Sequence, residues 1–390
     1  MNNFIYYTPT EVYFGKKQEE HLNEILNKYH YKKILFHYGM SSIKKTGLYD
    51  KVINQLKLSK IDYVELPGVS PNPKLSLVLK GVEICKKENV DLILAVGGGS
   101  VIDSAKSIAV GAKVDFNPWL FSIKEKTPQD HIPVGAILTI SAAGSDMSDS
   151  CVITNDSTNE KRGFNSRHNR LLFAILNPEL TYTVGPYQTA CGIVDIMMHT
   201  LERFISPGDD TPLTDNIAIG LLKAVIDAGR IVMKNPQDYD ARATLMWANS
   251  LSHNGLTSYG REFVMSVHQL EHELSGKFDN IAHGAGLAVL WPAWALKAYK
   301  YALNRFLKLS YEVMNVTPTQ NKEADAIKGI NLIKEFFKEI KMPTTLKELN
   351  VEEKDFEELA YNAMFKGKRT LKDVIDVDYK MALEILKSAK

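Results

Sequence analysis

Two segments of the chain place carboxylate and imidazole groups at helical spacing. Asp195 and His199 are four residues apart in CGIVDIMMHTLERF, and His268 and His272 are four apart in SVHQLEHELSGKFDNIAHG, where His283 follows after a short loop. Residues four apart share one face of a helix. Carboxylate and imidazole are ligands for Zn²⁺ and Fe²⁺, and one carboxylate with two or three imidazoles leaves a coordination position open. The spacing predicts a catalytic metal centre but leaves open which of His268 and His272 binds.

A glycine-rich loop follows the apolar run DLILAV. Gly97, Gly98 and Gly99 precede Ser100 at the start of a helical pattern. Glycines let the backbone approach a ligand, and a helix N-terminus suits a pyrophosphate. The loop is neither the G-x-G-x-x-G fingerprint nor a P-loop. Its position after a parallel strand favours phosphate binding over a simple strand-to-helix turn. Ser100 and Asp103 also have the spacing of a capping box.

A second turn, HYGMSSIKK, follows an earlier apolar run. It offers Gly39, the hydroxyls of Ser41 and Ser42, and then Lys44 and Lys45. Sites that select NAD often place an acid at this position to bind the ribose 2′-hydroxyl. Because the turn has hydroxyl and ammonium donors instead, it predicts NADP rather than NAD. The alternative is that the lysines only solvate the start of a helix.

The first half of the chain alternates apolar runs with helical patterns, which is typical of a mostly parallel sheet built from βαβ units. The expected strands are 33–37, 62–66, 91–96, 134–140 and 172–176, and the expected helices are 17–29, 46–58, 75–88 and 100–111. Residues 4–14 are aromatic and contain Pro9, which indicates an edge ribbon or a hairpin.

After about residue 186 the patterns become helical. The expected helices are 186–206, 213–234, 240–258, 261–275, 284–310, 322–340, 352–364 and 371–388. The sequence therefore predicts an α/β domain over residues 1–182 and an all-helical domain over residues 183–390.

Composition limits the function classes. The 390 residues carry 47 Lys and Arg against 46 Asp and Glu, so nothing in the charge favours nucleic acid or an anionic membrane as a partner. No signal peptide or apolar run of membrane-spanning length is recognisable. Cys85, Cys151 and Cys191 are too few for a disulfide framework. We expect a cytoplasmic protein.

These motifs together resemble the group III, or iron-containing, alcohol dehydrogenase family, and within it the NADPH-dependent butanol dehydrogenases and broad-range aldehyde reductases. The resemblance covers nearly the whole chain. It is carried by the stretches HYGMSSIKKTGLYD, AVGGGSVIDSAK, ILTISAAGSDMS, NPELTYTVGPYQTACGIVDIMMHTLE and HQLEHELSGKFDNIAHG. It implies a dinucleotide-binding domain, a helical metal-binding domain and an active site in the cleft between them.

The resemblance also assigns roles to individual residues. It implies a divalent metal, Fe²⁺ or Zn²⁺, on Asp195, His199, His268 and His283, with His272 as a nearby residue that is not a ligand and is our candidate for proton transfer. The cofactor-side positions that it implies are Gly39, Ser41, Ser42, Gly97, Gly98, Gly99, Ser100, Asp103, Thr139, Ser145 and Lys161. A homodimer is the expected assembly.

The chain departs from the family pattern in three places. Gly144-Ser145-Asp146 stands where GSE is usual, and Ala143 where threonine is common. The interval from His272 to His283 is one residue longer than usual, and we expect the loop at Asp279–Ile281 to hold the extra residue.

The expected reaction is reversible hydride transfer between NADP(H) and a primary alcohol/aldehyde pair such as butanol and butanal. The alternatives on the same architecture are a sugar-phosphate cyclase, which would need basic residues at the site, and a polyol dehydrogenase of the glycerol type. A non-enzymatic metal-binding protein would bind no nicotinamide nucleotide.

Overall fold

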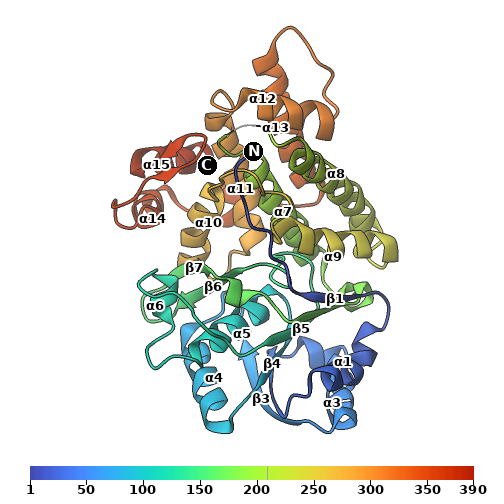
Figure 1. Cartoon of the computed structure of the whole chain (residues 1–390). Helices are drawn as coiled ribbons and strands as arrows, with labels where there is room; N and C mark the ends of the chain where they lie inside the picture. Colours follow the sequence, from blue (N-terminus) through green and yellow to red (C-terminus); the bar gives the residue numbers. More distant parts are fainter. Residues whose placement is uncertain (209) are drawn as a thin grey trace. The chain divides into compact units, whose positions relative to one another are not determined.

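The computed structural model describes residues 1–208 and 210–390. The chain divides into two compact units (Figure 1). We call residues 7–184 the sheet unit, and residues 1–6 together with 185–390 the helical unit.

The sheet unit is built on a six-stranded sheet in the order β1-β8-β5-β4-β2-β3, in which every neighbouring pair is parallel. The strands are β1 (Glu11–Phe14), β2 (Lys33–Gly39), β3 (Asp62–Val69), β4 (Leu92–Gly97), β5 (Val134–Leu138) and β8 (Phe173–Leu176). The central strand β4 is buried along its full length, which explains why it reads as an unbroken apolar run. The predicted parallel sheet is confirmed.

Helices lie between the strands. They are α1 (Leu22–Tyr29), α2 (Ser42–Lys45), α3 (Leu48–Ser59), α4 (Leu75–Glu88), α5 (Gly99–Gly111) and α6 (Trp119–Ser122). Because side chains alternate across a strand, the side chains of β2 contact helices on both faces of the sheet. Its Phe36 packs in one cluster with residues of α1 and α3, whereas His37 bonds Ser104 of α5. The sheet is therefore covered by helices on both faces.

Two features of this unit differ from the sequence expectation. Within residues 4–14 only β1 is a strand; it pairs in parallel with β8 at the sheet edge, so the edge interpretation is confirmed and the hairpin alternative is wrong. An antiparallel pair, β6 (Ser150–Asn155) and β7 (Glu160–Asn165), was not predicted. Its strands carry many polar residues, which hides them from a search for apolar runs.

The helical unit contains α7 (Pro186–Phe204), α8 (Pro212–Lys234), α9 (Tyr239–His253), α10 (Ser266–Lys277), α11 (His283–Ala298), α12 (Leu303–Lys308), α13 (Lys322–Glu339), α14 (Phe356–Ala363) and α15 (Tyr379–Ser388). The expected helix 284–310 is divided into α11 and α12. The segment 371–388 begins with a short antiparallel pair, β9 (Leu371–Lys372) and β10 (Asp376–Val377), before α15.

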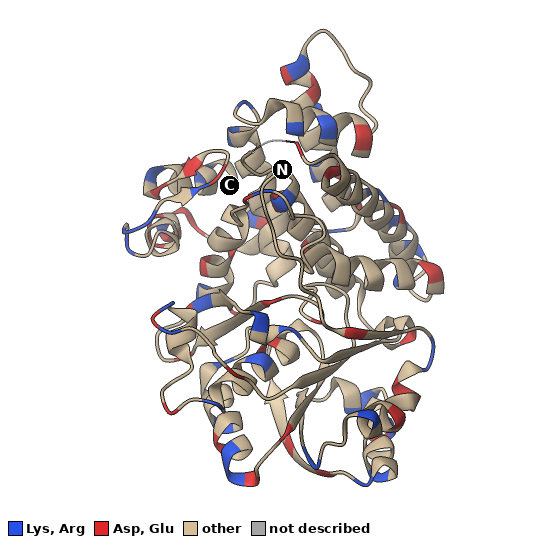
Figure 2. Cartoon of the chain, viewed as in Figure 1, with Lys and Arg blue, Asp and Glu red and all other residues tan. Residues whose placement is uncertain are grey.

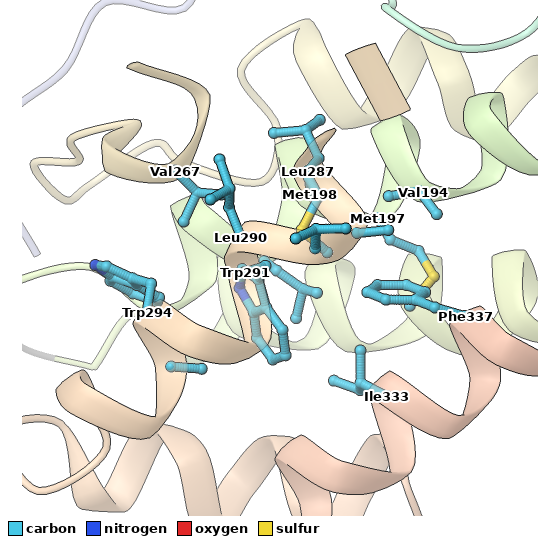
Figure 3. Close-up of a cluster of buried hydrophobic side chains, with 14 of the residues drawn as sticks. Val194, Met197, Met198, Val267, Leu287, Leu290, Trp291, Trp294, Ile333 and Phe337 are labelled. Atoms are coloured by element: carbon cyan, nitrogen blue, oxygen red, sulfur yellow. The ribbon is translucent and has the colours of Figure 1, made fainter. Parts of the chain in front are cut away.

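One large apolar cluster holds the helical unit together. Figure 3 shows part of it, with Met197 and Met198 of α7 beside Trp291 of α11 and Phe337 of α13. Trp291 is completely buried, and a buried aromatic side chain contributes several kcal/mol, on the order of 3–5 when judged by truncation. This packing fixes the positions of α7 and α11, which carry the predicted metal ligands.

The first residues of the chain belong to the helical unit. The Asn2 amide donates a hydrogen bond to the Gly260 carbonyl at 2.7 Å, and the ring of Phe4 lies 5.0 Å from that of Tyr259. Lys and Arg are interspersed with Asp and Glu along the chain (Figure 2). Among the described residues, no helix combines the length and the apolar character needed to cross a membrane.

Candidate functional site

Helix α7 presents the first two predicted ligands. Asp195 and His199 are one turn apart, and the Asp195 Oδ1 atom lies 3.4 Å from the His199 Nδ1 atom. Both residues are about 4 % exposed and are flanked by buried apolar residues, including Val194 and Met198. Burial of a carboxylate is costly unless a partner compensates it. The position of Asp195 therefore calls for a cation or a hydrogen-bond donor.

Helices α10 and α11 bring the other two predicted ligands to the same oxygen atom. His268 Nε2 and His283 Nε2 each lie 3.7 Å from Asp195 Oδ1. His283 is the first residue of α11, so the loop of residues 278–282 accommodates the longer interval. Three imidazole nitrogens from three helices thus surround one carboxylate oxygen.

Three of these donor atoms make no hydrogen bond within the described part of the chain. They are Asp195 Oδ1, His199 Nδ1 and His268 Nε2, and all three are buried. Metal–ligand bonds of about 2.1 Å in a tetrahedral site separate the donor atoms by about 3.4 Å. The observed separations of 3.4 and 3.7 Å from Asp195 are close to that value. The donor set therefore fits one divalent metal ion.

His283 is the outlying member of this set. The candidate ligand atoms of Asp195, His199 and His268 all lie within 4.8 Å of one another. His283 falls instead into a second mutually close group with Glu271 and His272, and it meets the first group through Asp195. The ring of His272 lies 5.6 Å from that of His283. His272 is thus beside the ligand cluster but outside the group that contains Asp195.

Burial and neighbouring carboxylates have opposite effects on the pKa values of the histidines in this cluster. Burial lowers the pKa of His199 well below its usual value, and the neighbouring His253 and His268 lower it further. Burial also lowers the pKa of His268, but Glu202 and Asp195 outweigh that effect and raise it to about 9. His199 is thus a neutral donor, whereas His268 interacts with two carboxylates.

Three residues near the cluster were not predicted. Glu202 bonds the ring of His268, Glu271 bonds the ring of His283, and the ring of His253 lies 4.1 Å from that of His199. Each glutamate follows a predicted ligand by three residues, in His199-x-x-Glu202 and His268-x-x-Glu271. That spacing was a usable signal. His253 lies on a different helix and has no comparable signature.

The predicted nucleotide loop lies at the carboxyl end of the central strand. Gly98 connects β4 to α5, and a β-carbon on it would lie 2.4 Å from the Ile140 side chain. A β-carbon on Gly99 would lie 2.9 Å from that of Ala143. A side chain at Gly98 or Gly99 would therefore force its neighbours to shift. The loop leads into the N-terminus of a 13-residue helix. This is the usual geometry for binding a phosphate group.

Three predicted cofactor segments follow neighbouring strands. Gly39 ends β2, Gly97 ends β4 and Thr139 follows β5, and these strands are adjacent and parallel. The carboxyl ends of parallel strands lie at one edge of a sheet, which is where ligands bind in open α/β sheets. The Thr139 amide donates to the Gly97 carbonyl at 3.1 Å. The sheet thus gathers these residues at one edge.

Asp103 does not cap α5. The N-cap position is Gly98 and carries no side-chain cap, so the capping-box interpretation of Ser100 and Asp103 is wrong. The Asp103 carboxylate instead accepts from Ser145 Oγ at 2.5 Å and from the Val152 amide at 2.9 Å. Burial raises its pKa. Asp103 therefore connects α5 to the segments that contain Ser145 and β6. Lys161, on β7, is buried.

The turn after β2 contains an aromatic group as well as the predicted donors. Ser41 and Ser42 are exposed. The Lys44 ammonium lies 4.8 Å from the centre of the Tyr49 ring and 5.6 Å from that of Tyr38. The hydroxyls of both tyrosines donate to Glu65, at 2.9 and 2.6 Å. Glu65 was not predicted as a residue of this turn, and its carboxylate accepts both of these bonds.

Comparison with known families gives two matches that together span most of the chain. Residues 9–178 match the family described as iron-containing alcohol dehydrogenase. Residues 189–390 match the C-terminal part of the Fe-containing alcohol dehydrogenase family.

Individual relatives are similar over their full lengths. The chain is 38% identical to NADH-dependent butanol dehydrogenase A of Clostridium acetobutylicum, with 100% of both chains covered. It is 33% identical to the NADPH-dependent aldehyde reductase YqhD of Escherichia coli, again with 100% of both covered. Among solved structures, NADH-dependent butanol dehydrogenase A from Thermotoga maritima superposes with a TM-score of 0.96 at 34% identity and covers 100% of this chain and 99% of its own.

Proposed function

Because the chain belongs to the iron-containing alcohol dehydrogenase family and is thereby an alcohol/aldehyde oxidoreductase, we propose that it interconverts primary alcohols and aldehydes such as butanol and butanal, with NADP(H) as the hydride carrier. The main support for this proposal is that Asp195, His199 and His268 place ligand atoms close together. These atoms are buried and have no hydrogen-bond partner within the described part of the chain. Without a bound cation, this buried cluster would be unfavourable.

The metal centre comprises Asp195, His199, His268 and His283, which hold Fe²⁺ or Zn²⁺. When bound, such a metal polarises the aldehyde oxygen as a Lewis acid. Four protein ligands of these types suit either ion, and Zn²⁺ generally binds more tightly than Fe²⁺, so the occupant follows metal supply as well as affinity. The burial of Asp195 and His199 excludes water from the ligand atoms. Asp195 thus supplies a buried negative charge for the cation.

The sheet unit binds the nucleotide. Gly97, Gly98, Gly99 and Ser100 bind the pyrophosphate through backbone amides at the start of α5. Thr139 and Ser145 lie along the nicotinamide and its ribose, and Asp103 and Lys161 lie on the side of the cofactor. Support for these roles comes from the edge at which β2, β4 and β5 end and from the bond between Ser145 and Asp103. Hydride transfer itself is the chemistry of the nicotinamide ring.

Preference for NADP(H) rests on the turn after β2. Gly39 carries no carboxylate, and the exposed hydroxyls of Ser41 and Ser42 offer donors to a 2′-phosphate. The nearby carboxylate of Glu65 is bound by two tyrosine hydroxyls. NADH is the second candidate, because several relatives, among them the butanol dehydrogenase of Clostridium acetobutylicum, are named NADH-dependent.

His272 is the proposed proton donor to the product alkoxide. It is half-buried on α10, one turn beyond His268, and its ring faces that of His283 at 5.6 Å. This position allows a proton to pass from imidazole to substrate oxygen directly or through one water molecule. His272→Ala should lower kcat and alter the pH profile while metal content stays normal. An unchanged rate and pH profile would remove His272 from the mechanism.

The assembly and location are proposed on separate observations. We propose a homodimer, because β1 is an edge strand of the sheet unit and edge strands are commonly covered. Phe4 and Ile5 of the helical unit are also exposed, at 51 % and 87 %. We propose a cytoplasmic location because all three cysteines are free and buried. Light scattering of the purified chain tests the dimer.

The decisive experiment compares NADPH and NADH oxidation with butanal, using metal-replete protein. We expect turnover with NADPH, a much lower kcat/KM with NADH, and no turnover by the Asp195→Asn variant with either nucleotide. Equal or better turnover with NADH would overturn the NADP assignment but not the reaction. No turnover with either nucleotide, together with a full metal content, would overturn the alcohol/aldehyde assignment and favour a cyclase or polyol substrate.

A further inference from the structure

The two His-x-x-Glu segments of the helical unit are linked in a chain from helix to helix. On α7, His199 belongs to the ligand cluster, and Glu202, three residues later, bonds Nδ1 of His268 on α10. On α10 the pattern repeats, because Glu271, three residues after His268, bonds Nδ1 of His283 on α11. Helices α7 and α10 therefore each supply a ligand and the carboxylate that holds the ligand of the next helix.

Both carboxylates are deeply buried. Glu202 is 1 % exposed and Glu271 is 0 % exposed. A carboxylate in such surroundings persists only when it is well bonded, and leaving it unpaired costs several kcal/mol. Each has an imidazole as partner, and the bonded nitrogen is Nδ1 in both cases. The repetition of the same bond on two helices indicates a specific arrangement.

This bond determines which imidazole nitrogen faces Asp195. When Nδ1–H donates to a carboxylate, the proton is fixed on Nδ1 and the lone pair is left on Nε2. In both histidines the Nε2 atom is the one that lies 3.7 Å from Asp195 Oδ1. The glutamates therefore select the tautomer and the ring orientation in which His268 and His283 can bind a cation.

We propose that Glu202 and Glu271 are positioning residues that pre-orient His268 and His283 for the metal and raise its affinity. The inference rests on the proposed metal centre. Carboxylates that bond metal-binding histidines increase ligand basicity, and their loss typically costs about 10–100-fold in metal affinity. His199 differs, since its Nδ1 faces Asp195 and its ring lies against His253.

Glu202 has further partners that bear on the experiment. Glu202 also accepts hydrogen bonds from the backbone amides of Val267, at 2.6 Å, and His268, at 3.3 Å, in the first turn of α10. Loss of Glu202 therefore removes a helix-end partner as well as a histidine partner. Substitutions of both glutamates are therefore compared with a control that affects stability alone.

The test measures Zn²⁺ affinity of the full-length apo-protein by competition with a chromophoric chelator. We expect Glu271→Ala to weaken Zn²⁺ binding by about 10–100-fold. Glu271→Gln should weaken it less, because the amide oxygen still accepts the Nδ1 proton although its charge is gone. Glu202→Gln should behave in the same way if it folds. The visible spectrum of the Co²⁺-substituted protein should change in each variant, and NADPH affinity should not.

Asp325→Asn is the matched control. Asp325 is a carboxylate of the same unit, 2 % exposed, whose partners are Thr319 and Tyr311. We expect this variant to lose stability without loss of Zn²⁺ affinity. An equal loss of affinity in Asp325→Asn would mean that general destabilisation explains the effect, and the inference would be wrong.

The outcomes separate this inference from the proposed function. If the wild-type protein binds no metal, or if Asp195→Asn binds it as well as the wild type, the metal centre itself is wrong. If the wild type binds one equivalent that Asp195→Asn loses, but Glu271→Ala keeps wild-type affinity and Co²⁺ spectrum, then the metal centre stands and the positioning role is overturned.

Discussion

Gly284 lies directly against the backbone of Cys191: a β-carbon on Gly284 would come within 2.2 Å of the Cys191 carbonyl oxygen. Gly284 follows His283 at the start of α11, and Cys191 precedes Asp195 by one turn of α7. The close approach of the two helices therefore determines how near His283 comes to Asp195. A side chain at this position would separate two of the proposed ligands.

We predict that Gly284→Ala destabilises the helical unit and weakens metal binding. The backbone of Cys191 cannot yield as a flexible side chain would, and overpacking of this kind costs about 1–3 kcal/mol. Thermal unfolding and the Zn²⁺ content of the purified variant measure the two effects. Gly220→Ala is the control, because Gly220 lies within α8 with nothing near its missing β-carbon. It should raise stability by about 0.5–1 kcal/mol and leave metal content unchanged.

We predict that Gly39→Asp shifts the cofactor preference toward NADH. A β-carbon at Gly39 meets the Val69 carbonyl oxygen at 3.6 Å, which is an ordinary contact, so a β-carbon fits at this position. The new carboxylate would repel a 2′-phosphate and accept a 2′-hydroxyl. We expect kcat/KM for NADPH to fall at least about tenfold, which corresponds to ~1.4 kcal/mol. Gly39→Ala should retain the wild-type preference. An unchanged preference in Gly39→Asp would place the 2′-phosphate elsewhere.

Stability of the sheet unit should fall between about pH 6.5 and pH 4 because of His37. Burial lowers the pKa of His37 to about 4, and its ring bonds the Leu66 carbonyl and Ser104 Oγ, each at 2.8 Å. In this range the unfolded chain binds a proton that the folded chain does not, so the folded state loses on the order of 3 kcal/mol as the pH falls.

Urea unfolding of the metal-free protein from pH 4.5 to pH 7.5 measures this effect. His37→Asn should be less stable at pH 7.5 but show a flatter pH dependence than the wild type. His30→Gln is the control, because His30 is exposed, and it should keep the wild-type slope. Equal slopes for His37→Asn and the wild type would assign the pH dependence to other groups.

Metal removal should affect the two units differently. After treatment with a strong chelator we expect loss of butanal reduction and a lower unfolding temperature of the helical unit, with NADPH binding retained. A ligand present at 100 times its Kd stabilises the folded state by about 2.7 kcal/mol. Addition of Zn²⁺ or Fe²⁺ should restore both properties in the wild type and neither in Asp195→Asn. Retained activity in the metal-free protein would contradict the proposed centre.

The sequence by itself determined the features that depend on local order. The strand 91–96 is an unbroken apolar run because β4 is buried throughout, and it was predicted within one residue at each end. The spacing of Asp195 and His199 is likewise a property of a single helix. The family resemblance then selected His268 over His272 as a ligand, which spacing had left open.

Only the tertiary structure decided which carboxylate meets which histidine. Glu202 and His268 are 66 residues apart in the chain, and Glu202 could equally have faced its own neighbour His199. Likewise, the polar β6–β7 pair and the true partners of Asp103 depend on contacts between distant segments. Periodicity reports which face of an element is buried but not what packs against it, because that partner is chosen by the packing of the whole unit.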